Sequence, residues 1–287
     1  MKTIAELLPV IDLEQIEDNI FRGPSHDIGS GRVFGGQVLS QALHAAMLTV
    51  PDERKMHSMH AYFILAGDME APIVYDVDRT RDGGSFTTRR VRAIQHGREI
   101  FVTSISFHRI EEGLSHQVEM PSITPPDELL SDQDMLQKFG DNMPESIKRM
   151  VRPRPILFKP TDPSIYFRQE KIEPQQDIWF KASGDVPADQ RIHRRILAYA
   201  TDYNLLASAI LPHRDQVGFK DLMMASLDHA LWIHQDIAID KWLLFHLDSP
   251  WAGGGRGFAR GSIFTEDGVL VASLVQEGLI RVRDRSK

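Results

Sequence analysis

The chain has 287 residues, of which 42% are hydrophobic and 25% are charged, and its formal net charge is −7. This composition is typical of a globular protein with room for two domains, and no apolar run is long enough to cross a membrane. The lack of cysteine excludes disulfides, thiolate nucleophiles and cysteine-ligated zinc, and the acidic balance argues against broad nucleic-acid binding.

The first residues predict a short helix and no export signal. Thr3 and Glu6 have the spacing of a helix capping box, and Pro9 is expected to end the helix. Charged residues and Pro9 interrupt the apolar pattern, so this segment lacks the continuous apolar core of a secretory signal. We therefore expect a cytoplasmic protein.

A glycine-rich stretch at 29–37 leads into the first buried helix. Small and apolar residues keep helical spacing from Val38 to Ala46, and Gly35 and Gly36 allow another backbone to approach the helix start. Strands are predicted on both sides of this helix, and several of them are rich in Val, Ile, Phe and Tyr: 13–22, 60–64, 73–80, 86–95 and 99–108. The first half therefore predicts one helix and a mostly antiparallel sheet.

Five arginines gather on and before one predicted hairpin: Arg79, Arg81, Arg89, Arg90 and Arg92. Strand alternation puts Arg90 and Arg92 on the same face of the sheet. Two interpretations stay open, namely a solvated outer face and a site for a phosphorylated ligand.

The middle of the chain is a proline-rich connector. Eight of the sixteen prolines fall between Pro121 and Pro163. Residues 127–151 have helical character and enough Leu and Met to dock on a surface, which predicts a covered linker and no free tether. We therefore divide the chain into a unit at 1–118, a linker at 119–165 and a second unit at 166–287.

The second half repeats the plan of the first. An offset of 171 residues superposes 83–105 on 254–276, with Gly97 on Gly268, and an offset of 169 superposes 57–64 on 226–233. This duplication predicts two similar units packed on each other, each an antiparallel sheet wrapped around one central helix: an α+β double hotdog fold. The elements predicted in the second half are a strand at 178–183, a helix at 192–210, and strands at 223–234, 242–248, 257–264 and 269–281.

An aspartate stands in the apolar part of the second predicted helix. Burying a carboxylate without partners is costly, so Asp202 either caps a break or faces solvent at the helix end, or lies at a site with polar companions. Ser226 and Gln276 are such companions, because each interrupts an apolar strand where the first copy of the repeat has His57 or Ile105. Each alone is typical of an ordinary strand residue, but the three together can hold a water molecule.

Other chemical patterns fit less well. The chain has no G-x-S-x-G elbow, and the glycines at 253–257 lack the lysine of a phosphate-binding loop. The pairs His57–His60 and His229–His234 have odd spacings, which place the members of each pair on opposite faces of a strand. We therefore expect no metal site and no cofactor.

Several segments resemble the acyl-CoA thioesterase II (TesB-like) family, and the resemblance runs in the expected order from about Leu8 to Arg281. The segments are FRGPSHDIGSGRVFGGQVLSQAL, YFILAGD, RDGGSFTTRRVRAIQHGREIF, YATDYNLL, SLDHALWIH, GRGFARGSIFTEDGVLVAS and VQEGLIR. The resemblance implies a double-hotdog enzyme that hydrolyses fatty acyl-CoA to a free fatty acid and coenzyme A, and that pairs further into a homodimer or tetramer.

The resemblance also carries the family's catalytic Asp, Thr or Ser, and Gln onto Asp202, Ser226 and Gln276. Asp202 is then the general base, while Ser226 and Gln276 hold the attacking water. Serine in place of the frequent threonine keeps the hydroxyl but has a looser rotamer.

The oxyanion of such a reaction is expected to meet backbone amides at a helix start, for which Gly35, Gly36 and Gln37 are candidates beside the start of the second helix. Two other functions stay open on the same fold. One is an acyl-CoA hydratase or dehydratase, and the other is a noncatalytic acyl-CoA binding module.

Overall fold

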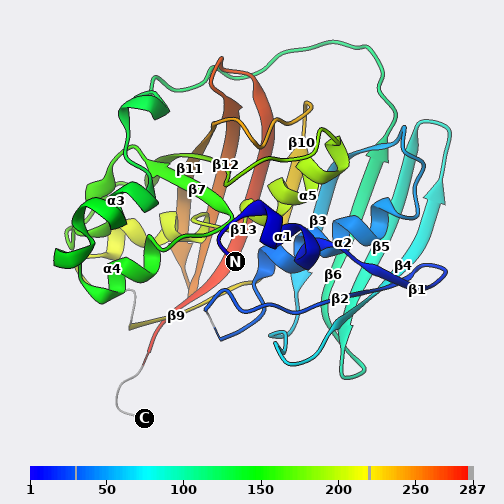
Figure 1. Ribbon diagram of the computed structural model, residues 1–287, viewed down its shortest axis with the longest axis horizontal. Helices are drawn as coiled ribbons and strands as arrows, with labels where there is room; N and C mark the ends of the chain where they lie inside the picture. Colours follow the sequence, from blue (N-terminus) through cyan, green and yellow to red (C-terminus); the bar gives the residue numbers. More distant parts are fainter. Residues whose placement is uncertain (30, 219–220, 284–287) are drawn as a thin grey trace.

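The computed structural model describes residues 1–29, 31–218 and 221–283, so the last four residues of the predicted second unit lie outside the described residues. Within these ranges, thirteen strands join one antiparallel sheet that curves around two central helices (Figure 1). The strands are β1 (Glu14–Glu17), β2 (Ile20–Gly23), β3 (Lys55–Phe63), β4 (Ile73–Asp82), β5 (Phe86–Gln95), β6 (Arg98–His108), β7 (Ile156–Pro160), β8 (Gln175–Ala182), β9 (Leu222–Ser226), β10 (Asp228–Ile233), β11 (Leu243–Gly253), β12 (Arg256–Thr265) and β13 (Leu270–Val282).

Helices are fewer than strands among the described residues. The α-helices are α1 (Ile4–Ile11), α2 (Gly35–Met47), α3 (Asp132–Phe139), α4 (Glu145–Met150) and α5 (Gln190–Ala200). The 3₁₀ helices are η1 (Pro126–Glu128), η2 (Gly140–Asn142), η3 (Pro163–Tyr166) and η4 (Leu206–His213). No helix in the described ranges is long and apolar enough to cross a membrane.

The order of the strands is mirrored about the middle of the sheet. It runs β1-β2-β4-β5-β6-β3-β10-β13-β12-β11-β8-β7, with β9 paired to β13. The order β2-β4-β5-β6-β3 in the first half therefore corresponds to β8-β11-β12-β13-β10 in the second half. Gly97 and Gly268, superposed by the offset of 171 residues, both close hairpins with positive φ, at 72° and 87°. This arrangement is what a duplicated sheet-and-helix unit predicts, and the α+β class is confirmed.

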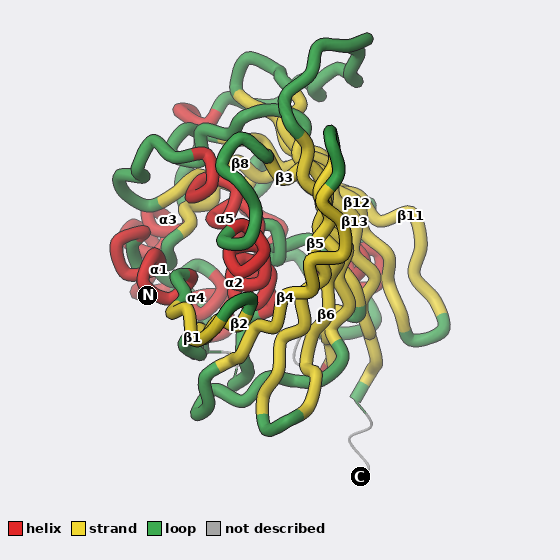
Figure 2. Tube along the Cα trace, turned by 90° about the vertical axis from the view of Figure 1, so that its right-hand side faces the viewer, coloured by secondary structure: helices red, strands yellow, loops and turns green. Residues whose placement is uncertain are grey.

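The two central helices, α2 and α5, lie antiparallel against one face of the sheet, which Figure 2 shows edge-on. The start of α2 meets the end of α5, because the Gly36 N–H donates to Asp202 just past that end. The end of α2 meets the start of α5, where Arg191 donates to the Met47 carbonyl. The α2 helix is buried mainly through small and apolar side chains such as Leu39, Ala42 and Leu43. The α5 helix is apolar only from Ile196 onward, and its first half buries polar side chains, among them Arg194.

The predicted second helix is too long. The structure ends α5 at Ala200, and a turn follows in which the Thr201 hydroxyl donates to the Ala198 carbonyl at 3.0 Å and Asn204 takes a φ of 65°. A left-handed residue stops an α-helix, and the chain continues as the 3₁₀ helix η4. Asp202 therefore lies in the turn after the helix and not within it.

Three other element boundaries differ from expectation. The predicted strand at 13–22 is a hairpin of β1 and β2 with Asn19 in the left-handed region, and α1 continues past Pro9 to Ile11. The predicted strand at 223–234 is broken at Leu227. The two parts, β9 and β10, therefore pair with different stretches of β13, namely 278–282 and 272–275. This break determines where Ser226 points.

The connector covers one end of the second half. Its helices α3 and α4 form a small apolar cluster with Met135, Met143, Ile147 and Val151 buried. Residues that we assigned to the linker also supply β7, which pairs with β8 at the edge of the sheet. The connector is thus packed against the protein along much of its length, as its Leu and Met content predicts.

Candidate active site

The three predicted catalytic side chains meet beside the start of α2. The Gln276 amide nitrogen donates to Asp202 Oδ1 at 3.2 Å and to Ser226 Oγ at 2.5 Å. The Gly36 N–H donates to the other carboxylate oxygen, Asp202 Oδ2, at 2.9 Å. The turn after α5, the end of β9 and the middle of β13 therefore converge on one point, although these residues are far apart in the sequence.

The break between β9 and β10 presents the serine to this point. Ser226 is the last residue of β9 and lies opposite Gly278 of β13. At the break, the Leu227 N–H donates to the Glu277 carbonyl, and the Leu227 carbonyl accepts from the Phe63 N–H at the end of β3, each at 2.9 Å. An irregularity of this kind re-aims a side chain, which here brings the hydroxyl to Gln276.

Two glycines let the start of α2 approach the carboxylate. A Cβ atom on Gly36 would lie 2.3 Å from the Tyr199 carbonyl oxygen, and one on Gly35 would lie 2.7 Å from Asp202 Oδ2. Neither position therefore has room for a side chain. The close approach also directs the positive end of the α2 dipole at the carboxylate.

Burial and hydrogen bonding act in opposite directions on Asp202. Burial raises the pKa of this carboxyl group to about 6, while hydrogen bonds from Gln276, from the Gly36 N–H and from Ser226 hold the pKa down. The group is therefore mostly ionised at pH 7, yet it is a much stronger base than an exposed aspartate. A pKa close to the working pH is suited to a general base.

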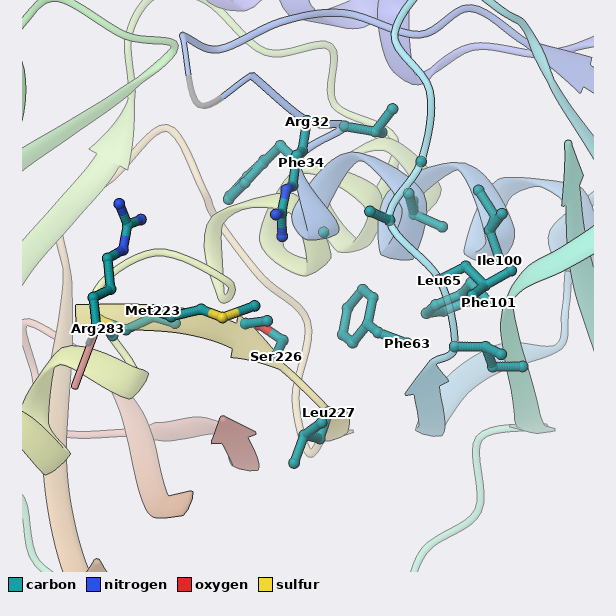
Figure 3. A pocket seen from close by; sticks show the side chains of 18 residues that line it. Arg32, Phe34, Phe63, Leu65, Ile100, Phe101, Met223, Ser226, Leu227 and Arg283 are labelled. Atoms are coloured by element: carbon teal, nitrogen blue, oxygen red, sulfur yellow. The ribbon is translucent and has the colours of Figure 1, made fainter. Parts of the chain in front are cut away.

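A cavity of about 500 Å³ opens over Ser226 and Gly35 (Figure 3). Its walls come from both halves of the chain, because the loop into α2, the end of β3 and the start of β6 face β9 across it. Phe63 and Phe101 form part of the apolar wall, with ring centroids 5.2 Å apart. Asp202 is not one of the lining residues, but it adjoins two of them: a Cβ atom on Gly35 would lie 2.7 Å from its Oδ2, and Gln276 donates both to Asp202 and to Ser226.

The three predicted oxyanion donors differ in their surroundings. The Gly36 N–H is engaged by Asp202, and the Gln37 N–H donates to the Phe34 carbonyl at 3.0 Å. The Gln37 side chain is buried and donates to the Pro24 carbonyl at 2.8 Å. Gly35 is the one of the three that lines the cavity.

The equivalent place in the mirrored half is filled with arginine. It lies where the end of α2 meets the start of α5, and there Arg194 donates to the Met56 carbonyl at 2.7 Å and to Asp236 at 3.0 Å. The position aligned with Gln276 is Ile105, which is fully buried, and the position aligned with Ser226 is His57, which bonds Ser106. Among the described residues, the polar trio is thus assembled on one side of the pseudo-symmetric pair of helices.

Sequence reasoning missed the aromatic packing around the trio. The Phe34 ring, just before α2, lies 5.1 Å from the Tyr199 ring and 4.6 Å from the Tyr203 ring. Both tyrosines flank Asp202 in the sequence with a spacing of four, which is a helical spacing and was the available signal. Their contact with Phe34 depends on how α2 and α5 pack, which no local pattern shows.

The arginine-rich hairpin is separate from this cavity. Arg89 is buried, 1% exposed, and donates to Thr49 and Asp82, while Arg92 forms ion pairs with Asp76 and Glu99. Arg90 and Arg92 are both exposed, as strand alternation predicts. These contacts favour the outer-face interpretation over a site for a phosphorylated ligand.

The histidine pairs also have structural surroundings. His57 and His60 both lie on the outer face of β3, where they contact Ser106 and the Trp232 ring, so the expectation of opposite faces is wrong for this pair. A bulge between Met56 and Ser58 shifts the alternation by one residue. His229 lies 3.2 Å from the Thr201 hydroxyl, and burial lowers its pKa to about 4.

Comparison with known proteins assigns the family. The family model described as Acyl-CoA thioesterase matches residues 158–279, and the model described as Acyl-CoA thioesterase N-terminal domain matches residues 21–108. The Acyl-CoA thioesterase 2 of Haemophilus influenzae is 40% identical over 276 residues, which cover 96% of this chain and 96% of that protein. The chain belongs to the acyl-CoA thioesterase family.

Further acyl-CoA thioesterases agree with this assignment. Human acyl-coenzyme A thioesterase 8 is 38% identical over 283 residues, covering 96% of this chain and 88% of that protein. The crystal structure of the acyl-CoA thioesterase II TesB2 from Mycobacterium marinum has a TM-score of 0.80 at 39% identity, with 97% and 99% of the two chains covered. The predicted family, the double hotdog fold and the class of thioester hydrolase are therefore confirmed.

Proposed function

We propose that this protein hydrolyses fatty acyl-CoA to a free fatty acid and coenzyme A, with a water molecule activated by Asp202. The arrangement that supports this most directly is a carboxylate of pKa about 6 that is hydrogen-bonded by an amide and sits behind a hydroxyl at the wall of a partly apolar cavity. The relatives named above as acyl-CoA thioesterases support the same substrate class.

In the first step, water attacks the thioester carbon and gives its proton to Asp202. Gln276 and the Gly36 N–H donate to different carboxylate oxygens of Asp202. Each oxygen has two lone pairs, so the carboxylate can also accept from Ser226 and from the water. Ser226 Oγ accepts from Gln276, which leaves the hydroxyl proton for the carboxylate or the water oxygen. Holding the water in line with the carbonyl is the role that we assign to these two residues.

In the second step, the tetrahedral intermediate expels the thiolate of coenzyme A. The thiolate takes the proton that Asp202 received, so the carboxylate is regenerated and no covalent enzyme intermediate is needed. We assign the stabilisation of the negative oxygen to the Gly35 N–H at the cavity wall and to the positive end of α2 behind it.

Release of thiol from palmitoyl-CoA in the presence of a thiol reagent tests the proposed function. We expect free coenzyme A and palmitate in equal amounts. In water labelled in its oxygen atom, a single turnover places the label in palmitate and not in Asp202. Hydration with the thioester intact would identify a hydratase, and stoichiometric binding without product would identify a binding module. Either result overturns the proposal.

The acid limb of the pH profile is expected to follow Asp202. Because the carboxylate is the active form, kcat/KM should rise with pH through about 6 and then level off. The Gln276 amide holds the pKa of Asp202 down, so Gln276→Met should move this limb to higher pH as well as slow the reaction. A profile measured with wild type and variant checks this, and an unmoved limb would assign the titration to another group.

A further inference from the structure

We propose that Arg32 and Arg283 bind the phosphates of coenzyme A in the active-site cavity, while the acyl chain lies along the apolar wall that Phe63, Leu65 and Phe101 form. This rests on the proposed function and adds the orientation of the substrate to it. The two arginines come from different halves of the chain, one from the loop before α2 and the other from the residue after β13.

The cavity is chemically polarised. In Figure 3 the Arg283 guanidinium lies at one end of the cavity beside Met223 of β9, and Phe63, Leu65 and Phe101 lie on the other side of Ser226. The Arg32 guanidinium lies beside the start of α2, above Ser226. Acyl-CoA has the same polarity, since its thioester separates an apolar chain from an arm that ends in phosphates. With the thioester at Ser226, only one orientation of the substrate places its acyl chain on the apolar wall and its phosphates near the arginines.

Charge favours this assignment. None of the eighteen described residues that line the cavity is acidic, and two of them are arginines. The whole chain carries a net charge of −7, so its overall field repels a polyanion such as coenzyme A. Local guanidinium groups, which form paired hydrogen bonds with phosphate oxygens, are needed to overcome this repulsion.

The spacing along β9 fits the length of the substrate. The Arg283 N–H donates to the Asp221 carbonyl at 2.7 Å, which fixes this arginine beside the start of β9. Ser226 ends the same strand, and the strand rise puts it roughly 13 Å from Leu222. The pantetheine arm has about as many backbone bonds as four peptide units, so it spans roughly 14 Å when extended. An arm that starts at the trio and follows β9 thus delivers its phosphates to Arg283.

Comparing two thioesters of the same acyl group tests the assignment. Acyl-CoA carries the phosphates, and acyl-N-acetylcysteamine keeps the thioester and lacks them. We expect wild type to prefer acyl-CoA, and Arg32→Gln and Arg283→Gln each to lower the ratio of the two kcat/KM values about tenfold, as for loss of a charged hydrogen bond. Arg90→Gln is the matched control, because Arg90 is exposed on the outer face of β5 and away from the cavity.

Calorimetric binding of coenzyme A provides a second readout that needs no turnover. The dissociation constant should rise about tenfold in each cavity variant and stay unchanged in Arg90→Gln. An unchanged ratio and affinity in both cavity variants, or an equal loss in the control, would overturn the assignment. If wild type released thiol from neither ester, the proposed function would fail instead, and coenzyme A binding would still report on the arginines.

Discussion

Asp202→Asn is expected to lower kcat by roughly 10²–10⁴-fold, the range typical of losing a general base. The amide keeps the size of the side chain and can still accept from the Gly36 N–H, but it cannot take a proton from water. Steady-state hydrolysis of acyl-CoA measures the loss. A variant with near wild-type kcat would remove Asp202 from the mechanism.

A neighbouring carboxylate provides the matched control. Asp228 begins β10, accepts from the Glu277 N–H at 2.7 Å, and has a pKa that burial raises. Asp228→Asn preserves that acceptor and is expected to stay within a few-fold of wild type. An equal loss of activity in both variants would point to a general disturbance of this end of the sheet and not to a specific base.

The stability of Asp202→Asn separates loss of chemistry from loss of fold. The folded-state pKa of Asp202, about 6, lies above the unfolded value of 3.8, so wild type loses stability as pH rises between these values. Above pH 6 the buried charge costs about 3 kcal/mol in the wild type. The variant should therefore be at least as stable as wild type at pH 7 to 8, with the difference vanishing below pH 4, as chemical denaturation at several pH values would show.

The polar trio was accessible from the sequence because it breaks a repeat. Where two copies of one unit diverge, a serine and a glutamine in otherwise apolar strands stand out, and the resemblance to the thioesterase family then joined them to Asp202. The hairpin glycines Gly97 and Gly268 were accessible for a similar reason, since both copies need a positive φ at the same place. In both cases, comparing the two copies of the repeat identified the residues.

The end of α5 could not be read in the same way. Residues 196–210 keep an apolar helical pattern, yet Asn204 takes a left-handed φ and a 3₁₀ helix follows. Asparagine adopts that conformation more readily than most residues, but it does so only where tertiary packing demands it. The turn that presents Asp202 therefore depends on packing against α2.

The cavity was the least accessible feature, because no single segment contains it. Its walls come from the loop into α2, from the end of β3, from the start of β6 and from β9, which meet only where the two halves join. The same holds for Arg32 and Arg283, which no motif in the sequence singles out. Only the folded chain brings them to the wall of one cavity.

Gly36→Ala is expected to reduce both stability and activity, because the backbones of the two central helices approach each other closely at this position. A Cβ atom there would lie 2.3 Å from the Tyr199 carbonyl oxygen, and a backbone atom between two packed helices cannot move aside cheaply. The helices must separate, and the Gly36 N–H must then leave Asp202 Oδ2. We expect a destabilisation of about 1–3 kcal/mol, as for an overpacked core.

Activity should fall further than this loss of stability explains. A displacement of the carboxylate by about 1 Å relative to Ser226 and Gln276 can cost roughly 100-fold in rate, even while most molecules remain folded. Thermal unfolding and kcat/KM, measured well below the unfolding temperature, separate the two effects. Gly84→Ala is the control, because a Cβ atom there meets nothing within 4 Å. If Gly36→Ala matched Gly84→Ala in both measurements, the close approach of α2 to α5 would not be what positions Asp202, and the base would have to be held by Gln276 and Ser226 alone.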